Sequence, residues 1–198
     1  MSTTVLGIIW GLAILAWVAI RMPRRRKAKK RKVVAHQRSL WERTALGLCI
    51  LGLFVFPFAY FLSGWPAGAN YRPSIAQSLL GVAALGAFLW VFYLAHKQLA
   101  DNWSVTLEVR ENHTLVQEGL YRYVRHPMYS SFWLWGLGQA LIVPNMAAGL
   151  AGIASVALLY FTRVNKEEDM MRNQFGQDYE TYSQKTGRII PKLTAFQR

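Results

Sequence analysis

Most polar residues that could do chemistry lie in two short segments in the second half of the chain. The first begins at His113, passes through Tyr121 and ends with residues 125–129 (RHPMY). The second contains Arg163 and the acidic residues 167–169 (EED). A guanidinium group can hold a planar carboxylate through two parallel hydrogen bonds. These residue types therefore permit a site that binds an anionic group and orients a carboxylate.

The local spacing gives both segments a helical interpretation. Pro127 suits the first turn of a helix, because the N–H that it lacks would be unpaired there. His126 would then be the N-cap residue, beside free N–H groups and the positive end of the helix dipole, where an anion is favoured. Tyr129 would share a helix face with His126, and Arg163 would share one with Glu167, four residues later.

Each of these patterns also has an ordinary structural explanation. Arg163 and Glu167 could form a surface ion pair worth about 0.3–0.5 kcal/mol. The remaining alternatives are these: Arg122 and Arg125 as membrane anchors, His126 as a solvated interface histidine, residues 167–169 as the first turn of a surface helix, and Tyr121 and Tyr129 as interfacial aromatic residues.

The elements that position these residues are long apolar stretches. The chain has 198 residues, a single domain by length, and is 53% hydrophobic and 17% charged, against about 45–50% and about 25% in soluble domains. A spanning helix needs about 20 mainly apolar residues. The sequence predicts an all-α integral membrane protein with about five transmembrane helices, at residues 4–20, 46–62, 75–94, 129–143 and 146–164.

The first of these stretches is expected to be a retained span, because no basic segment precedes it and no small-residue cleavage site follows it. Pro57 predicts a kink in the second. The last two form a helical hairpin around Pro144 and Asn145, with small residues that let its helices approach closely: Gly136, Gly138, Gly149, Gly152 and Ser155. Such a hairpin would bring the two polar segments together at one end.

Charge gives the expected direction of the spans. The net charge is +13, and nine of the 23 basic residues lie in residues 21–32. A juxtamembrane cluster of this kind is typical of contact with anionic lipid headgroups, and no nucleic-acid recognition motif accompanies it. The five spans would leave 22 basic residues on one side and only Arg72 on the other. The positive-inside rule then predicts an outside N-terminus and a cytosolic C-terminus.

Two further polar segments are expected on the cytosolic side. Residues 100–125 contain an alternating apolar stretch at Trp103, Val105, Leu107 and Val109 that looks extended, but it has no evident partner strand, so no sheet is predicted. Residues 166–185 suit a helix broken at Gly176. The single cysteine, Cys49, excludes an internal disulfide and a multi-cysteine metal site, and no metal is predicted.

The order of these motifs resembles the isoprenylcysteine carboxyl methyltransferase family. The similarity covers roughly residues 100–191. It consists of H-x-hydrophobic-V-x-x-G-x-Y-x-x-x-R-H-P-x-Y, the hairpin, R-x-x-x-E-E and F-G-x-x-Y-x-x-Y. It implies S-adenosylmethionine as methyl donor and S-adenosylhomocysteine as product. The cofactor-binding residues that it implies are His113, Thr114, Leu115, Val116, Tyr121, His126, Pro127, Met128, Tyr129, Glu167 and Glu168.

The resemblance also implies a reaction, with Arg163 meeting the substrate and Arg163 and Glu167 as the catalytic residues. The acceptor would be the carboxylate of an isoprenylcysteine-like molecule entering from the bilayer. A carboxylate with a pKa near 4 is already ionised at pH 7, so no general base is needed. Residues 100–198 would form the methyltransferase region, after three helices and a basic loop (residues 21–45) in residues 1–99.

Other functions remain open at this point. A phospholipid amine N-methyltransferase shares the hairpin and the glutamates, and a membrane sterol reductase that uses NADPH is distantly similar. A membrane anchor whose basic loop recruits a partner would be a non-enzymatic role. The membrane would be the plasma membrane in a prokaryote and the endoplasmic reticulum in a eukaryote.

Overall fold

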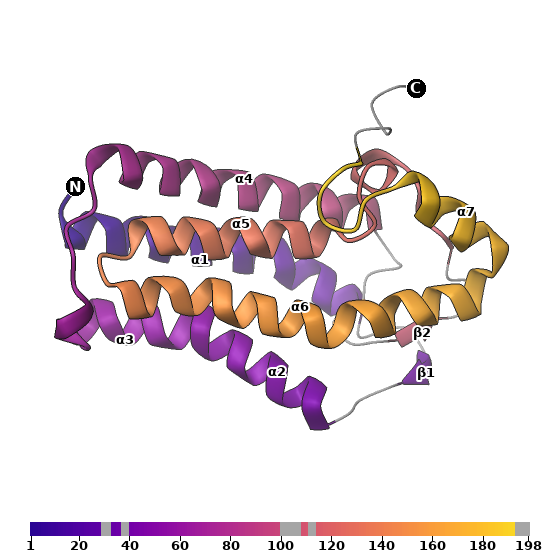
Figure 1. Cartoon of the computed structure of the whole chain (residues 1–198), viewed down its shortest axis with the longest axis horizontal. Helices are drawn as coiled ribbons and strands as arrows, with labels where there is room; N and C mark the ends of the chain where they lie inside the picture. The colour runs from indigo at the N-terminus through magenta and orange to yellow at the C-terminus, as the bar shows by residue number, and fades with distance from the viewer. Residues whose placement is uncertain (29–32, 37–39, 100–107, 111–113, 193–198) are drawn as a thin grey trace.

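Long helices lying side by side make up most of the molecule. The computed structural model describes residues 1–28, 33–36, 40–99, 108–110 and 114–192. Its α-helices are α1 (Thr3–Ala28), α2 (Leu40–Ile50), α3 (Phe56–Ser63), α4 (Ile75–Leu99), α5 (Pro127–Ile142), α6 (Met146–Phe175) and α7 (Gln177–Lys185). Figure 1 shows α7 and two short strands at one end of the bundle and the N-terminus at the other.

The described residues contain four helical segments long and apolar enough to cross a membrane: Thr3–Pro23, Leu40–Ser63, Ile75–Leu99 and Met146–Phe175. They agree with four of the five expected spans. The fifth corresponds to α5, which has 16 residues. At 1.5 Å per residue it is about 24 Å long, short of a hydrocarbon core of about 30 Å. The all-α membrane class is confirmed, and the count of five stays a prediction.

The second span changes its helical pitch near the expected proline. Between α2 and α3 lies a π-helical segment, η1 (Leu51–Val55), directly before Pro57. A proline removes one helical hydrogen bond and crowds the carbonyl four residues earlier, so the helix widens there. The carbonyl of Gly52 accepts a hydrogen bond from Nε2 of the fully buried Gln139, at 2.9 Å. The irregular turn therefore ties this span to α5.

The predicted hairpin of α5 and α6 is confirmed. Asn145 caps α6, because its Oδ1 accepts from the backbone N–H of Ala148 at 3.0 Å. The predicted small residues serve two different contacts: Gly136, Gly149 and Gly152 face the opposite helix of the hairpin, whereas Gly138 faces Leu85 of α4 and Ser155 faces Gly52 of η1. Close approach in this bundle therefore involves four helical segments and is not confined to the hairpin.

The expectation that the extended segment has no partner strand is wrong. β1 (Val33–His36) pairs antiparallel with β2 (Glu108–Arg110), with His36 opposite Glu108 and Val33 opposite Arg110. The partner strand, β1, directly follows the basic segment in the first half of the chain. Its pairing with β2 joins distant parts of the sequence, so a local pattern cannot reveal it. Of the alternating residues, Val109 lies in β2, and Trp103, Val105 and Leu107 lie outside the described residues.

The end of the bundle that carries α7 is closed by a returning segment of chain. α6 runs on to Phe175, and Gly176, with a φ of 51°, ends it at the predicted break. After α7 the chain runs back along residues 123–126. Gly187 donates its N–H to the carbonyl of Tyr123 at 3.0 Å, and the carbonyl of Gly187 accepts from the N–H of Arg125 at 2.8 Å. We call residues 186–189 the C-terminal strap.

Candidate active site

The two polar segments of the sequence meet at the end of the hairpin that carries α7, as predicted. Pro127 is the first residue of α5 and His126 is its N-cap. Tyr129 Oη donates a hydrogen bond to Glu167 Oε1 at 2.8 Å, across the hairpin. Arg163 Nη2 lies 3.2 Å from the same oxygen, and His126 Nδ1 lies 3.6 Å from Glu167 Oε2. The helical spacing and the turn together bring these four side chains into one cluster.

This cluster is buried except on one side. Tyr129 is 8% exposed and Arg163 is 7% exposed, whereas the Glu167 side chain retains 23% exposure. The Arg163–Glu167 pair is therefore not the exposed surface ion pair of the alternative interpretation. A partly accessible carboxylate beside a buried guanidinium can contact a ligand that carries charge of either sign.

A third charged residue of the cluster was missed by sequence reasoning. Glu42, in the first turn of α2, is 4% exposed, and its Oε1 lies 3.7 Å from Arg163 Nη2. Its place on the same helix face as the buried Ala45 and Cys49 was a signal available in the sequence. Arg163 thus stands between a carboxylate from its own helix and one from a separate span.

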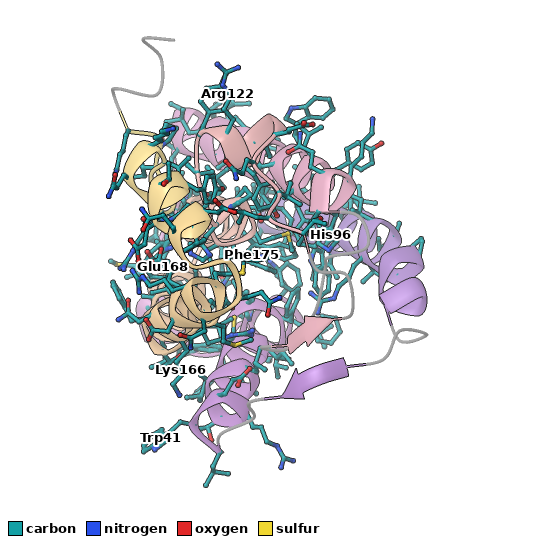
Figure 2. The ribbon with its side chains drawn as sticks, turned by 90° about the vertical axis from the view of Figure 1, so that its right-hand side faces the viewer. Trp41, His96, Arg122, Lys166, Glu168 and Phe175 are labelled. Carbon is teal, nitrogen blue, oxygen red and sulfur yellow. The ribbon has the colours of Figure 1, made fainter. Side chains whose placement is uncertain are left out.

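Glu168 has different surroundings, although it follows Glu167 directly. It is 1% exposed and lies between α6 and α7 in Figure 2. Its Oε1 accepts from Arg125 Nε at 3.0 Å and lies 3.3 Å from His126 Nε2, and its Oε2 accepts from Arg188 at 2.8 Å. Both oxygens are thus occupied by side chains of this protein. The predicted cofactor contact of Glu168 stays a prediction, and the geometry favours a positioning role.

Arg125 and Arg122 differ, although both were considered membrane anchors. Arg122 is exposed at the outer edge of the molecule. The Arg125 side chain is 9% exposed and binds Glu168. Its Nη1 also donates to the carbonyls of Ser183, at 2.8 Å, and Thr186, at 2.5 Å. Arg125 therefore fastens α7 and the strap to the start of α5.

The remaining predicted residues surround the cluster at varying depth. Tyr121 lies in the 3-10 turn η4 (Gly119–Arg122) and is buried, and its carbonyl accepts from Tyr182 Oη at 2.7 Å. Burial raises the pKa of Tyr121 above its usual value, with smaller contributions from Tyr182 and Glu167, so its phenol stays neutral. Met128 is half-buried against the apolar core.

The segment before η4 contains the other predicted cofactor residues. Thr114 is exposed, and Leu115 and Val116 are half-buried. His113 lies outside the described residues. Their roles stay predictions.

The fold and the site together define an integral membrane protein of the all-α class with a charge cluster at one end of a helical hairpin. The family model for the isoprenylcysteine carboxyl methyltransferase (ICMT) family matches residues 79–173. That range contains α5, most of α6 and every predicted site residue. Over these residues the chain is similar to this family. Glu42 and the C-terminal strap lie outside the matched residues.

Individual relatives show the same similarity. The protein-S-isoprenylcysteine O-methyltransferase of Schizosaccharomyces pombe is 31% identical over 125 residues, which are 63% of this chain and 53% of that protein. A probable protein-S-isoprenylcysteine O-methyltransferase of Oryza sativa subsp. indica is 31% identical over 87 residues, covering 44% of this chain and 46% of the relative. The chain spans about half the length of these curated relatives.

A solved structure has a similar fold. It is that of the eukaryotic intramembrane Ras methyltransferase ICMT, with a TM-score of 0.53 and 22% sequence identity. The likeness covers 80% of this chain and 55% of the other. At this identity it supports the fold.

Proposed function

We propose that this protein transfers a methyl group from S-adenosylmethionine to the carboxylate of a lipophilic, isoprenylcysteine-like acceptor, giving a methyl ester. The observation that carries the proposal is the cluster of Arg163, Glu167, Tyr129 and His126 within the family match. The names of the S. pombe and Oryza relatives support the same reaction.

The charges of the cluster fit this cofactor. The partly exposed carboxylate of Glu167 suits the positive sulfonium of the donor. The N-terminus of α5 offers backbone N–H groups that suit the cofactor's own carboxylate. When bound, the cofactor would supply an electrophilic methyl group to the acceptor oxygen, and the electron pair of the broken C–S bond would stay on sulfur.

The protein's own side chains would act by positioning. Arg163 would orient the acceptor carboxylate, and Glu167, held by the hydroxyl of Tyr129, would hold the cofactor. His126 and Tyr129 would shape the cofactor site together with residues 113–116, Tyr121, Pro127 and Met128, and Glu168 would hold His126 in place. No proton has to move, because the acceptor is ionised at pH 7. Well-oriented reactants can reach effective molarities of about 10⁵ M or more.

The site would face the cytosol, with the acceptor entering from the bilayer. We expect residues 1–99 to contribute three spans and the basic segment, which would bind anionic headgroups, and residues 100–198 to contribute the chemistry. In this topology the turn around Gly68 lies outside and β2 lies inside. In a Cys49-free background, a membrane-impermeant thiol reagent should label Gly68→Cys and fail to label Arg110→Cys. The opposite labelling would invert the topology.

The identity of the methylated product tests the reaction itself. Membranes containing the protein are incubated with methyl-labelled S-adenosylmethionine, and the products are treated with mild base. A methyl ester releases its label as volatile methanol. Label that resists base and stays in the phospholipid fraction would mean N-methylation of an amine, and the carboxylate role of Arg163 would be abandoned. Absence of transfer, with binding of NADPH instead, would favour the reductase.

A further inference from the structure

The C-terminal strap lies directly against the start of α5, although it is outside the residues that the family model matches. The backbone N–H of His126, the N-cap of α5, donates to the carbonyl of Arg188 at 2.9 Å. Gly187 has no room for a side chain, because a Cβ there would collide with the carbonyl of Ile190. Glycine therefore permits the tight course of the strap, which fixes the backbone of the N-cap residue.

The side chain of Arg188 reaches the same histidine by a second route, through Glu168. Arg188 Nη2 donates to Glu168 Oε2 at 2.8 Å. The other oxygen of that carboxylate, Oε1, lies 3.3 Å from His126 Nε2. The opposite ring nitrogen, Nδ1, lies 3.6 Å from Glu167 Oε2. One residue of the strap thus contacts the backbone of His126 and, by way of Glu168, supports the ring that faces Glu167.

The next residue of the strap lies beside the other predicted cofactor residue at the start of α5. Ile189 packs against a small cluster of buried residues on α5 and α6: Tyr129, Tyr160 and Val164. Its carbonyl accepts a hydrogen bond from Ser130 Oγ at 2.6 Å. Tyr129 is the residue whose hydroxyl donates to Glu167. The strap therefore borders the candidate site at both His126 and Tyr129.

We infer that Arg188 is a positioning residue of the methyl-donor site, which holds the Glu168 carboxylate so that this carboxylate holds the imidazole of His126. The inference rests on the proposed function and deepens it. Hydrogen bonds between ionised groups are short and directional, and residues that contact a ligand need such support to keep their geometry. The Arg188 side chain is 44% exposed, and a pair with an exposed partner adds little to overall stability. Its main effect is therefore on orientation.

The test removes the charge of Arg188 and separates binding of the donor from binding of the acceptor. Calorimetry on the detergent-purified full-length protein should show that Arg188→Gln raises the Kd of S-adenosylmethionine about tenfold, as expected for the loss of a hydrogen bond between charged groups. Arg188→Lys keeps the charge and should retain most of the affinity. The acceptor KM at saturating donor should not change, because Arg163 is proposed to orient the acceptor. The melting temperature should change little.

Lys192 provides a matched control from the same stretch of chain. It is exposed, and its Nζ donates to the carbonyls of Ser183, at 3.3 Å, and Gln184, at 2.8 Å, at the end of α7. Lys192→Gln also removes one positive charge that binds to α7. It should change neither the Kd of S-adenosylmethionine nor the melting temperature.

Two results would overturn the inference. Unchanged affinity for S-adenosylmethionine in folded Arg188→Gln would show that the orientation of His126 does not depend on Arg188. A large drop in the melting temperature, with the donor Kd and the acceptor KM raised together, would show that Arg188 serves only the fold. Failure of the wild-type protein to bind S-adenosylmethionine would instead refute the proposed function itself, a result distinct from either of these.

Discussion

Glu167 and Glu168 are neighbours on α6, yet their surroundings differ in almost every respect. The Glu167 side chain is 23% exposed and contacts residues of the hairpin, Arg163, Tyr129 and His126. Glu168 is 1% exposed, and three arginines and His126 surround its carboxylate. The carboxylate of Glu167 is therefore accessible to a ligand, whereas both oxygens of Glu168 are paired with side chains of the protein.

The difference follows from helix geometry. Successive residues of an α-helix point about 100° apart, so adjacent acids face different neighbours. Glu167 points to α5, and Glu168 points to α7 and the C-terminal strap. The strap is connected to the start of α5 by backbone hydrogen bonds from Arg125 and His126. Two consecutive glutamates can thus have different roles: one can contact a ligand while the other holds neighbouring segments of the protein together.

The largest effect is expected from removing the charge of Glu168. Glu168→Gln leaves the buried Arg125 without its carboxylate, and breaking a buried ion pair in this way typically costs about 3–5 kcal/mol. We expect a marked drop in the melting temperature of the detergent-purified protein and easier proteolysis of the segment after Gly176. Thermal unfolding and limited proteolysis measure these two effects.

Asp169 is the matched control for that experiment. It is the next residue on α6, and its side chain is 64% exposed and pairs with a partly exposed Arg172 at 2.8 Å. Exposed pairs contribute at most about 1 kcal/mol, so Asp169→Asn should hardly change the melting temperature. Equal destabilisation by the two substitutions would remove the distinction between the buried and the exposed acid.

A smaller effect is expected from substituting Arg163, which contacts Glu167, the acid proposed to bind the ligand. Arg163→Lys keeps the charge that faces Glu42 and Glu167 but loses the planar, two-pronged geometry. The acceptor KM should rise about tenfold, while the melting temperature should change little. Steady-state kinetics with the two substrates varied separately measures this. A change in the melting temperature with an unaltered acceptor KM would reassign Arg163 to the fold.

Local rules predicted a large part of this arrangement. Pro127 at the start of α5, the turn at Pro144 and Asn145, and the break at Gly176 all depend on backbone preferences of single residues. Four of the predicted spans agree with the structure, because length and hydropathy are enough to identify a spanning helix. The meeting of the two polar segments then followed from one short turn.

Contacts between distant segments could not be predicted in the same way. Glu42 reaches Arg163 from another span, Arg188 reaches Glu168 from the strap, and β1 pairs with β2 across about 70 residues of chain. The spacing of Glu42 to Ala45 and Cys49 indicates the helix face on which it lies, but the partner in each of these contacts has no periodic or local signature, because it depends on how the helices pack. Glu167 and Glu168 could not be told apart in the sequence for the same reason.

The central claim, that Glu167 binds the cofactor while Glu168 maintains the fold, is tested most directly by calorimetry on Glu167→Gln. This substitution keeps size and helix propensity and removes the charge. The account predicts that the affinity for S-adenosylmethionine falls tenfold or more, about 1.4 kcal/mol, in a protein whose melting temperature is close to that of the wild type. Unchanged cofactor binding by the folded variant would contradict the claim and would leave Arg163 and Glu167 as a structural ion pair.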